Sequence, residues 1–523
     1  MTNLTIREAR QLAFEHLFRS MEADENLAID RHFPESFADT LSRLEVYNKH
    51  LFRPNTYLHK WWARRCGSTF RTILKQFVID PNLRDYYAPG GLEGRIVLDP
   101  MMGGGTTLHE AIRLGANVIG ADIDPIPIIQ ARASLSTVTL TELQLAFDRF
   151  FADLYSHIGH LFRTECPECG DTTDLQYMLH GLRKRCDCGE VVQIDSYLLR
   201  QEAQRDFHIC PDNWEIVTGP CERQQEQPQA RRLVLKTETS CPSCGQKYQE
   251  LLDTPFYTRY VPIAIVGQCE RHGLFLRTPS SADLARIEQA NSMRNDLDFG
   301  LIDNFTVQNG PKSGDLIRHN VLNYLDAFSS RQLLYIHHTL RVLGSLERSI
   351  RLNLALLIST SLEFNSMLCG YKGSSKNRPG AIRHVFALHA YSFPYTAAEN
   401  NPVNRRRSSG NLQQLFQDRI VRGRKWSVSP IERRIDHAGK TSLVEIPGEW
   451  DGGSEVYSQV DLGQDTHRFW LIHGDSSRLP VADQSVDFVV TDPPYYDNVQ
   501  YSDLAAFFRV WLARLLPDEI DWR

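Results

Sequence analysis

The C-terminal part of the sequence contains a strand that ends in two consecutive prolines. Residues 486–495 read VDFVVTDPPY, and Pro493 and Pro494 each remove a backbone N–H donor, so the strand must stop at Asp492. An exocyclic amino group of a nucleobase is a poor nucleophile, because its lone pair is delocalised into the ring. The Asp492 carboxylate and a backbone carbonyl beside it offer two acceptors for such an amine, and Tyr495 offers a ring on which an extruded base can stack. The stretch predicts a rigid site that acts on an exocyclic amine.

A glycine-rich turn follows an earlier strand. The apolar residues that end in Asp99 are followed by Pro100 and by three consecutive glycines, residues 103–105, and Thr106 opens a helix. Glycines at such a turn let the backbone pass close to a ligand. The next strand ends in Asp122, whose carboxylate can accept hydrogen bonds from both hydroxyls of a ribose. This arrangement favours a nucleoside cofactor, whereas the turn lacks the Lys-Ser/Thr pair of a P-loop and the spacing of a dinucleotide-binding motif.

The cysteines are concentrated in one block. Nine of the eleven lie between Cys166 and Cys269, and in a cytosolic setting such clustering favours metal ligation. In chain order the ligands form two tetrads that could each hold one structural Zn²⁺: Cys166, Cys169, Cys186 and Cys188, and then Cys241, Cys244, Cys269 and His272. The halves could also pair across the block, and Cys210 and Cys221 remain as further possible ligands, so one or two zinc ions are expected.

Size and composition exclude several classes of protein. The 523 residues exceed what one hydrophobic core normally holds, so about two to four domains are expected. No apolar run approaches the roughly 18 residues of a membrane span, and the N-terminus has no secretion signal, which together favour a cytoplasmic protein. The net charge of −6 gives no global case for nucleic-acid binding, although residues 405–407 and 422–425 carry local basic runs.

The elements around the candidate residues alternate in type. Residues 1–90 read as helical, with an amphipathic helix expected at 58–79. A strand, a helix and a second strand follow within residues 94–122, and this alternation is typical of a parallel sheet. The alternation then stops, and strands of this kind return only at residues 468–491. The expected fold class is therefore α/β, with a Rossmann-like sheet that is interrupted by a large insertion.

Together these stretches resemble a known family. DPMMGGGTT resembles the cofactor loop and TDPPYYDNVQYSDL the catalytic loop of amino-directed DNA methyltransferases, and HKWWARR looks like the segment that wraps the methionine end of the cofactor. More narrowly, the chain is similar to the adenine-specific DNA methylases that contain a zinc ribbon. This similarity also covers ADIDP, SSRQLL, FFRVWL and HAYSFPYTAAENNPVNRRRSSGN, and it touches most of residues 50–515.

The resemblance implies an enzyme that uses S-adenosyl-L-methionine to methylate double-stranded DNA, at adenine N6, in restriction-modification or phage defence. Cytosine N4 and RNA stay open as targets, because the same residues would serve either amine. The implied catalytic residues are Asp492, Pro493, Pro494 and Tyr495, and the methyl group would pass directly from the sulfonium to the nitrogen. The implied cofactor-binding residues are Asp99, Pro100, Gly103, Gly105, Thr106, Asp122 at the ribose, Asp475 at the adenine, and Lys60.

Four segments are expected along the chain. Residues 1–160 would hold the N-terminal helices and the cofactor-binding half of the methyltransferase domain, and 461–523 the catalytic-loop half. Between them, 161–275 would hold one or two zinc ribbons and 276–460 a DNA-recognition insertion. This insertion is predicted to be helical at 320–370 and loop-rich and basic at 371–460, with residues 405–425 as the candidate for phosphate contact.

The chain departs from the family pattern at its C-terminal end. Methyltransferases of this class have a seven-stranded sheet, whereas four strands can be assigned here and one helix follows the DPPY motif before Arg523. An exposed sheet edge and an unpacked helix face are therefore expected. We expect a truncated gene product, or one half of a split enzyme whose sheet a second polypeptide completes. The rival reading is a non-catalytic, zinc-dependent DNA-binding subunit.

Overall fold

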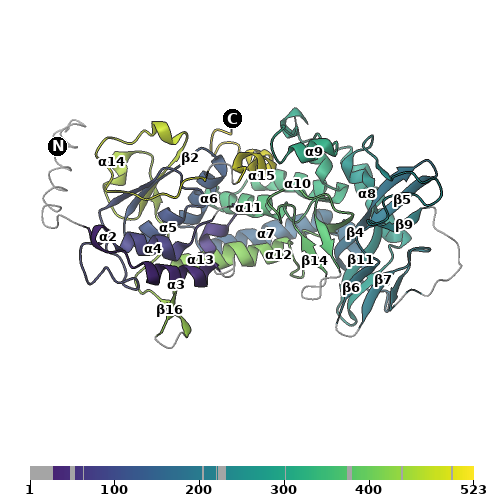
Figure 1. Ribbon diagram of the computed structural model, residues 1–523, viewed down its shortest axis with the longest axis horizontal. Coiled ribbons are helices and arrows are strands. Elements are labelled where there is room, and N and C mark those ends of the chain that lie inside the picture. Colours follow the sequence, from purple (N-terminus) through teal and green to yellow (C-terminus); the bar gives the residue numbers. More distant parts are fainter. Residues whose placement is uncertain are drawn as a thin grey trace. The chain divides into compact units, whose positions relative to one another are not determined.

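The computed structural model describes residues 27–46, 53–62, 64–202, 205–219, 221, 231–300, 302–373, 380–436, 440–495 and 499–522. The chain divides into two compact units, and Figure 1 labels many of their elements. Unit 1 contains Met1–Thr141, Arg419–Asn498 and Asp518–Arg523, and unit 2 contains Glu142–Asp418 and Val499–Pro517. The four segments expected from the sequence stay a prediction.

A five-stranded parallel sheet forms the centre of unit 1. Its strand order is β18-β19-β2-β1-β20, and all four neighbouring pairs run parallel. The strands are β1 (Ile96–Asp99), β2 (Asn117–Asp122), β18 (Ser454–Glu455), β19 (Arg468–His473) and β20 (Phe488–Val489). The prediction of an α/β fold with a parallel sheet in these segments is confirmed.

Helices cover this sheet and bury its apolar side chains. The helix α5 (Thr106–Arg113) joins β1 to β2 and is buried along its whole length, and α6 (Pro125–Leu135) follows β2. The core includes Val97, Val118, Leu108 and Ile128, and burial of strands on both faces explains their nearly continuous apolar sequences. The other elements of this unit are α2 (Ala28–Arg31), α3 (Glu35–Val46), η2 (Pro54–Tyr57), α4 (Gly67–Lys75), α13 (Arg422–Val428), β16 (Ile431–Ile435), β17 (Thr441–Glu445), α14 (Gln459–Leu462) and η8 (Ser476–Arg478).

The prediction of a helix at 58–79 is confirmed only for Gly67–Lys75 and is wrong on either side of it. The helix α4 begins only at Gly67, and the described residues of 58–66 form no helix. Glu45 of α3 accepts hydrogen bonds from the first two backbone N–H groups of α4, at 3.1 and 3.0 Å, and so caps the helix there. Gln130 of α6 accepts from His59 N and donates to the carbonyl of Thr56, so the backbone around residues 56–59 is held against α6. Residues 1–26, also expected to be helical, lie outside the described residues.

A ten-stranded mixed sheet dominates unit 2. Its central strand β4 (Thr172–Cys186) pairs with β11 (Tyr260–Cys269), β15 (Thr396–Asn400) and β5 (Gly189–Ile194). The other strands are β3 (Arg163–Glu165), β9 (Arg232–Leu235), β10 (Gln249–Glu250), β12 (Gly273–Arg277), β13 (Gly370–Lys372) and β14 (Ala381–Arg383). A separate three-stranded sheet contains β6 (Leu198–Gln201), β7 (Asp206–Ile209) and β8 (Ile216–Thr218). The stretch expected to be loop-rich, 371–460, therefore contributes the buried strand β15.

The helices of unit 2 confirm the helical prediction for residues 320–370. Two of them, α10 (Ser330–Leu343) and α11 (Arg348–Ser361), lie in this range. The others are α7 (Leu140–Ile158), α8 (Ser281–Arg294), α9 (Gly314–Arg318), α12 (Leu412–Leu415), α15 (Tyr501–Leu515) and the short turns η3 (Gly159–Phe162), η4 (Phe256–Arg259), η5 (Ile302–Phe305) and η6 (Tyr324–Ala327). The π-helix η7 (Phe416–Val421) spans the boundary between the two units, which falls after Asp418. Among the described residues, no helix combines the length and the apolar character that crossing a membrane requires.

The face of α15 is buried, contrary to the expectation of an unpacked helix after the DPPY motif. Phe507 and Trp511 are fully buried, and their rings lie 6.0 and 5.3 Å from the ring of Phe328. The helix therefore packs within unit 2. At the edge of the parallel sheet, β20 stands last in the strand order and Val489 is 60% exposed.

A buried network of charges joins distant segments of unit 1. Arg113 of α5 donates to Glu110, Glu432 and Glu449 at 2.7, 2.8 and 2.9 Å. Burial by itself would raise the pKa of Glu432, but the neighbouring guanidinium groups lower it to about 2. All members are at most 5% exposed, and their charges cancel: Arg53, Arg71 and Arg113 against Glu110, Glu432 and Glu449. The network connects the N-terminal segment, α5 and residues 432–449.

We expect Arg113→Met to destabilise unit 1 by about 3–5 kcal/mol, because loss of one cation leaves buried carboxylates without a partner. The thermal unfolding midpoint measures this effect. Arg43→Met is the matched control, since the Arg43–Asp39 pair is exposed and its loss changes stability little. Equal midpoints for the two variants would contradict the role assigned to the network.

Candidate active site and metal centres

The predicted cofactor residues on β1 and β2 come together at the carboxyl end of the sheet. Gly103 N donates to Asp122 Oδ2 at 2.9 Å, so the glycine turn is fastened to the end of the neighbouring strand. Gly103 and Gly105 have φ angles of +47° and +77°, which side chains disfavour, and Gly105 directly precedes Thr106 at the start of α5. Burial raises the pKa of Asp122 to about 7.

The predicted catalytic loop lies beside this turn. The strand β20 pairs with β1 and ends at Val489, and Thr491 lies in the loop that follows it. The Thr491 hydroxyl donates to Asp99 Oδ1 at 2.7 Å, which joins the two loops directly. Asp99 is 3% exposed, and burial raises the pKa of its carboxyl. Asp492, Pro493, Pro494 and Tyr495 therefore follow immediately after a residue that is bonded to the predicted cofactor loop.

The Asp492 carboxylate has partners on both of its oxygen atoms. Tyr495 donates its hydroxyl to Asp492 Oδ1 at 2.6 Å, and Arg65 Nε forms an ion pair with Asp492 Oδ2. The Arg65 guanidinium also lies over the Tyr495 ring, 5.0 Å from its centroid. The Tyr495 ring is 57% exposed, and its bond to Asp492 raises the pKa of the phenol. Arg65 therefore occupies both the Asp492 carboxylate and the face of the Tyr495 ring, the two groups that the predicted site would offer to a base.

Asp475 and Pro100 lie on neighbouring loops at the same end of the sheet. Asp475 follows β19, whose last residue His473 is in register with Asp122 on β2. Its exposed carboxylate caps η8 by accepting from Ser477 N at 2.9 Å, and this bond lowers the pKa of Asp475. Ser476 donates its hydroxyl to the carbonyl of Pro100, so the loop after β19 contacts the loop after β1.

The segment that contains Lys60 lies against the glycine turn. A Cβ atom built on Gly103 would lie 3.2 Å from the indole Nε1 of Trp61, and one on Gly104 would lie 3.4 Å from Arg64 Cγ. Lys60 is the residue next to Trp61 and is partly buried. The segment and the turn are thus neighbours, and the approach runs through Trp61 and Arg64.

The eight predicted metal ligands form two clusters, and the halves pair across the block, the alternative that the sequence left open, rather than in chain order. One cluster contains Cys166, Cys169, Cys269 and His272, and the other contains Cys186, Cys188, Cys241 and Cys244. Within each cluster the ligand atoms lie within 4.8 Å of one another. The halves pair across the block because β4, which separates Cys169 from Cys186, is a 15-residue strand that carries the two cysteine pairs to its opposite ends. Each cluster could hold one metal ion.

Three cysteine loops share one backbone hydrogen-bond pattern. The loops begin at Cys166, Cys210 and Cys241, and in each the cysteine N–H donates to the carbonyl five residues later. The N–H four residues later donates back to the cysteine carbonyl, and all six distances lie between 2.8 and 3.0 Å. The residue at this fourth position has a φ of +73°, +64° and +71°, respectively. The Cys210 loop therefore has the backbone of the two metal-binding loops.

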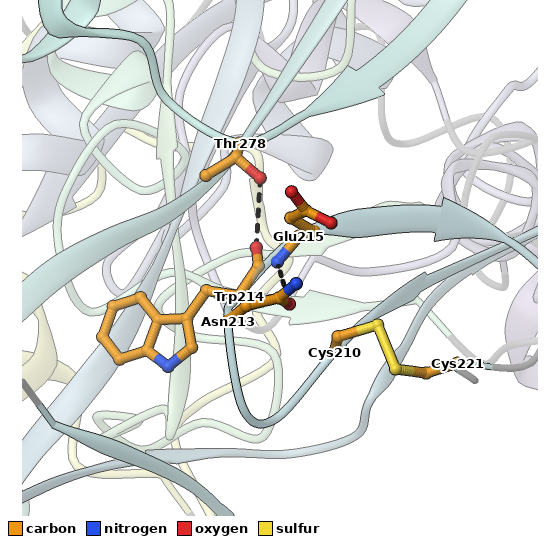
Figure 2. The surroundings of a disulfide bond; sticks show 6 residues. All are labelled: Cys210, Asn213, Trp214, Glu215, Cys221 and Thr278. Carbon is orange, nitrogen blue, oxygen red and sulfur yellow. Dashed lines mark hydrogen bonds between the residues drawn. A yellow bond between two sulfur atoms is a disulfide. The ribbon is translucent and has the colours of Figure 1, made fainter. Parts of the chain in front are cut away.

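The Cys210 loop differs from the other two in its third position. Asn213 stands where the others carry a second cysteine, and its side-chain oxygen accepts from Glu215 N at 3.0 Å. Cys210 instead forms a disulfide with Cys221 (Figure 2). Trp214, at the positive φ, donates its N–H to Cys210 and accepts from the Thr278 hydroxyl at 3.0 Å. Cys210 and Cys221, which the sequence left open as ligands, thus belong to neither cluster.

The basic residues singled out in the sequence have different surroundings. Arg405 and Arg406 line a groove of about 790 Å³ in unit 2, where they pair with Asp174 and Glu270 at 2.9 and 2.8 Å. Arg424 is not available for phosphate contact: it is 5% exposed and donates to backbone carbonyls at the end of α6. Arg407, Arg422 and Lys425 are exposed.

Sequence reasoning missed two residues of the candidate active site. Thr491 precedes the DPPY motif and connects it to Asp99, and Arg65 pairs with Asp492. The strand end before the prolines offered a signal for Thr491, since a hydroxyl at that position reaches a neighbouring strand. Arg65 carried no such signal, because the approach of its segment to the catalytic loop depends on the tertiary fold.

The ligand pairing gives a direct test through double variants. We expect Cys186→Ser and Cys241→Ser to remove the same metal ion, so the double variant loses one equivalent, like each single variant. Combining Cys186→Ser with Cys166→Ser should remove two equivalents, because these residues belong to different clusters. Metal content per chain by mass spectrometry measures both. Loss of two equivalents from the first double variant would refute the pairing.

Comparison of the chain with protein-family models, with curated proteins and with solved structures gave no match. The family resemblance of the sequence motifs therefore stays a prediction.

Proposed function

We propose that the protein is a methyltransferase that uses S-adenosyl-L-methionine and modifies an exocyclic amino group in DNA, with adenine N6 as the favoured target. The observation that carries this proposal is the contact between the two loops, in which Thr491 bonds to Asp99. In open parallel sheets, ligands bind at the carboxyl ends of strands where the strand order reverses. The order reverses at β1, which lies between β2 and β20.

The hydrogen-bond acceptors at this edge fit a nucleoside cofactor. Asp122 and Asp475 follow the neighbouring strands β2 and β19, and carboxylates there can accept from ribose hydroxyls and an adenine amine. Asp122 accepts two backbone N–H bonds, from Gly103 and Asp124, and a carboxylate has about four acceptor positions, so further donors can be accommodated. When bound, the cofactor would supply a methyl group on a sulfonium centre.

The catalytic loop would prepare the amine for attack. Asp492 and a backbone carbonyl beside it accept the amine N–H groups and localise the nitrogen lone pair, while Tyr495 stacks on the base. Arg65 must first leave Asp492, because it forms an ion pair with the carboxylate and lies over the Tyr495 ring. Pro493 and Pro494 restrict the backbone, which lowers the entropic cost of holding this geometry.

Zinc is the metal that best suits the two cysteine clusters. Four thiolates in one cluster, and three thiolates with one imidazole in the other, are ligand sets of structural zinc sites. Four protein ligands close such a site, which suits a structural ion rather than a catalytic one.

Double-stranded DNA is the proposed partner, and the groove beside the first cluster is a candidate for phosphate contact. Arg405 is 56% and Arg406 is 40% exposed, so a phosphate could replace their carboxylate partners. The exposed residues Arg422 and Lys425 of unit 1 are further candidates. Cytosine N4 and RNA stay alternative targets, since the same loop would serve either amine.

One observation favours a second function, a cofactor-binding but non-catalytic DNA-binding subunit. Arg65 and Tyr495 contact the two oxygen atoms of Asp492, so a substrate amine would find neither oxygen accessible in this arrangement. A partner polypeptide would then be needed to complete or open the site.

Asp492→Asn tests the proposed chemistry. We expect methyl transfer from labelled cofactor to defined duplex oligonucleotides to fall by about 10²–10³-fold, because the variant loses the charged acceptor for the amine. Cofactor affinity, measured by calorimetry, should stay within about twofold, since Asp492 contacts the substrate side. Mass analysis of the product nucleosides separates N6-methyladenine from N4-methylcytosine.

Asp483→Asn is the control for this experiment, because Asp483 is exposed and lies between η8 and β20. Full activity in Asp492→Asn would overturn the proposed mechanism. Cofactor binding without turnover in the unmodified chain would favour the non-catalytic subunit, and absence of cofactor binding would overturn both.

Cofactor affinity should depend on pH through Asp122. Burial raises the pKa of this carboxyl from 3.8 to about 7, so the folded protein binds this proton more tightly than the unfolded chain does. The contribution of Asp122 to stability therefore falls as pH rises from about 4 to about 7. Hydrogen bonds from a ribose favour the carboxylate, so we expect affinity to rise by about tenfold between pH 6 and pH 8. Calorimetric titrations should show this rise, and a rise of the same size in Asp122→Asn would contradict it.

A further inference from the structure

Two helices of unit 2 bring two imidazoles and a carboxylate together at the protein surface. Asp153 and His157 lie one turn apart on α7, and His338 lies on α10. Residues four apart on a helix project from the same face. The exposed fractions of the three side chains are 42%, 54% and 11%, so solvent reaches the group. Neither the proposed active site nor the cysteine clusters include these residues.

The three side chains are in mutual contact. His338 Nε2 lies 2.7 Å from Asp153 Oδ2, and His157 Nδ1 lies 3.6 Å from Asp153 Oδ1. The two imidazole rings face each other with centroids 4.1 Å apart and a tilt of 33°. One ligand atom from each residue lies within 4.8 Å of the others. Two histidines and one carboxylate are thus gathered around one point.

Hydrogen bonding alone gives an incomplete account of this group. Asp153 could serve as the partner of a single protonated histidine, yet two imidazoles converge on it. His157 Nδ1 bonds to the backbone carbonyl of Asp153 at 2.9 Å, which leaves Nε2 of the same ring as the second possible ligand atom. Two imidazoles and one carboxylate are a ligand set that Zn²⁺, Ni²⁺, Co²⁺ and Cu²⁺ bind, with remaining positions filled by water.

We propose that Asp153, His157 and His338 form a surface site for a divalent transition metal that links α7 to α10. An ion would replace the proton shared by His338 Nε2 and Asp153 Oδ2. Ligand atoms about 2.0–2.1 Å from a tetrahedral ion lie about 3.3 Å apart. His338 and Asp153 must therefore separate by about 0.6 Å, and His157 must approach by up to about 1.5 Å. His157 can supply this movement because it is the most exposed of the three.

This site differs in kind from the two cysteine clusters. Those clusters offer four protein ligands each, whereas the surface group offers three and leaves at least one position open. It contains no thiolate, so its preferred metals include those that imidazole suits, such as Ni²⁺. Its occupancy is independent of the proposed methyltransferase activity.

Calorimetric titration of the full chain, purified with its cysteine clusters loaded, tests this proposal with Ni²⁺ as the probe. We expect one equivalent of Ni²⁺ to bind. His157→Ala and His338→Ala should each weaken binding by at least about tenfold, since loss of even an outer-shell partner costs about 10–100-fold. Ni²⁺ should also raise the thermal midpoint of the unmodified protein but not of the variants.

His160→Ala is the matched control. It removes an exposed imidazole just beyond the end of α7 without touching the three ligands, so Ni²⁺ binding should be unchanged. Should His338→Ala fail to fold, the more exposed His157→Ala still decides the question. The proposal is overturned if the unmodified chain binds no Ni²⁺, if both variants bind it as tightly, or if only cysteine substitutions abolish binding.

Discussion

The buried charges of Arg53, Arg71 and Arg113 with their three glutamates are the constraint on which unit 1 depends. A buried charge without its partner costs several kcal/mol, so the N-terminal segment, α5 and residues 432–449 must meet as a complete set. The helix α5 begins at the glycine turn, so the network that neutralises the core also fixes the loop after β1. This requirement brings together segments of unit 1 that are separated in the sequence by Glu142–Asp418.

The three aspartates at the carboxyl ends of the strands differ in burial and in hydrogen-bond partners, so they suit different roles. Asp99 is buried and bonded to the catalytic loop, Asp122 is bonded to the backbone of the glycine turn, and Asp475 is exposed at the start of η8. Asp99 can therefore act as a structural link, while Asp122 and Asp475 keep acceptor capacity for a ligand. Under the proposed function, the pairing of Arg65 with Asp492 makes the described arrangement a closed form of the site.

The sequence predicted the local features of this protein better than its long-range pairings. The strands that end at Asp99, Asp122 and His473 and the prolines after Asp492 are set by apolar runs and backbone restrictions, which act over a few residues. The pairing of the cysteine ligands across the block depends on the length and strand pairing of β4. The contact of Arg65 with Asp492 depends on the packing of the whole fold. The disulfide at Cys210 escaped notice because its loop carries Asn213 where a cysteine would reveal the shared backbone pattern.

The strand β4 has a mechanical consequence for unit 2. Cys169 lies just before its first residue and Cys186 is its last, so the two ligand clusters lie at opposite ends of one strand that is about 50 Å long at about 3.3 Å per residue. An ion in each cluster would fix the two ends of this strand, while β11 and β15 pair with its middle. β3 also pairs with the first residues of the strand and β5 with its last, so removal of one ion would leave the other cluster and the whole ladder of β4 to resist fraying.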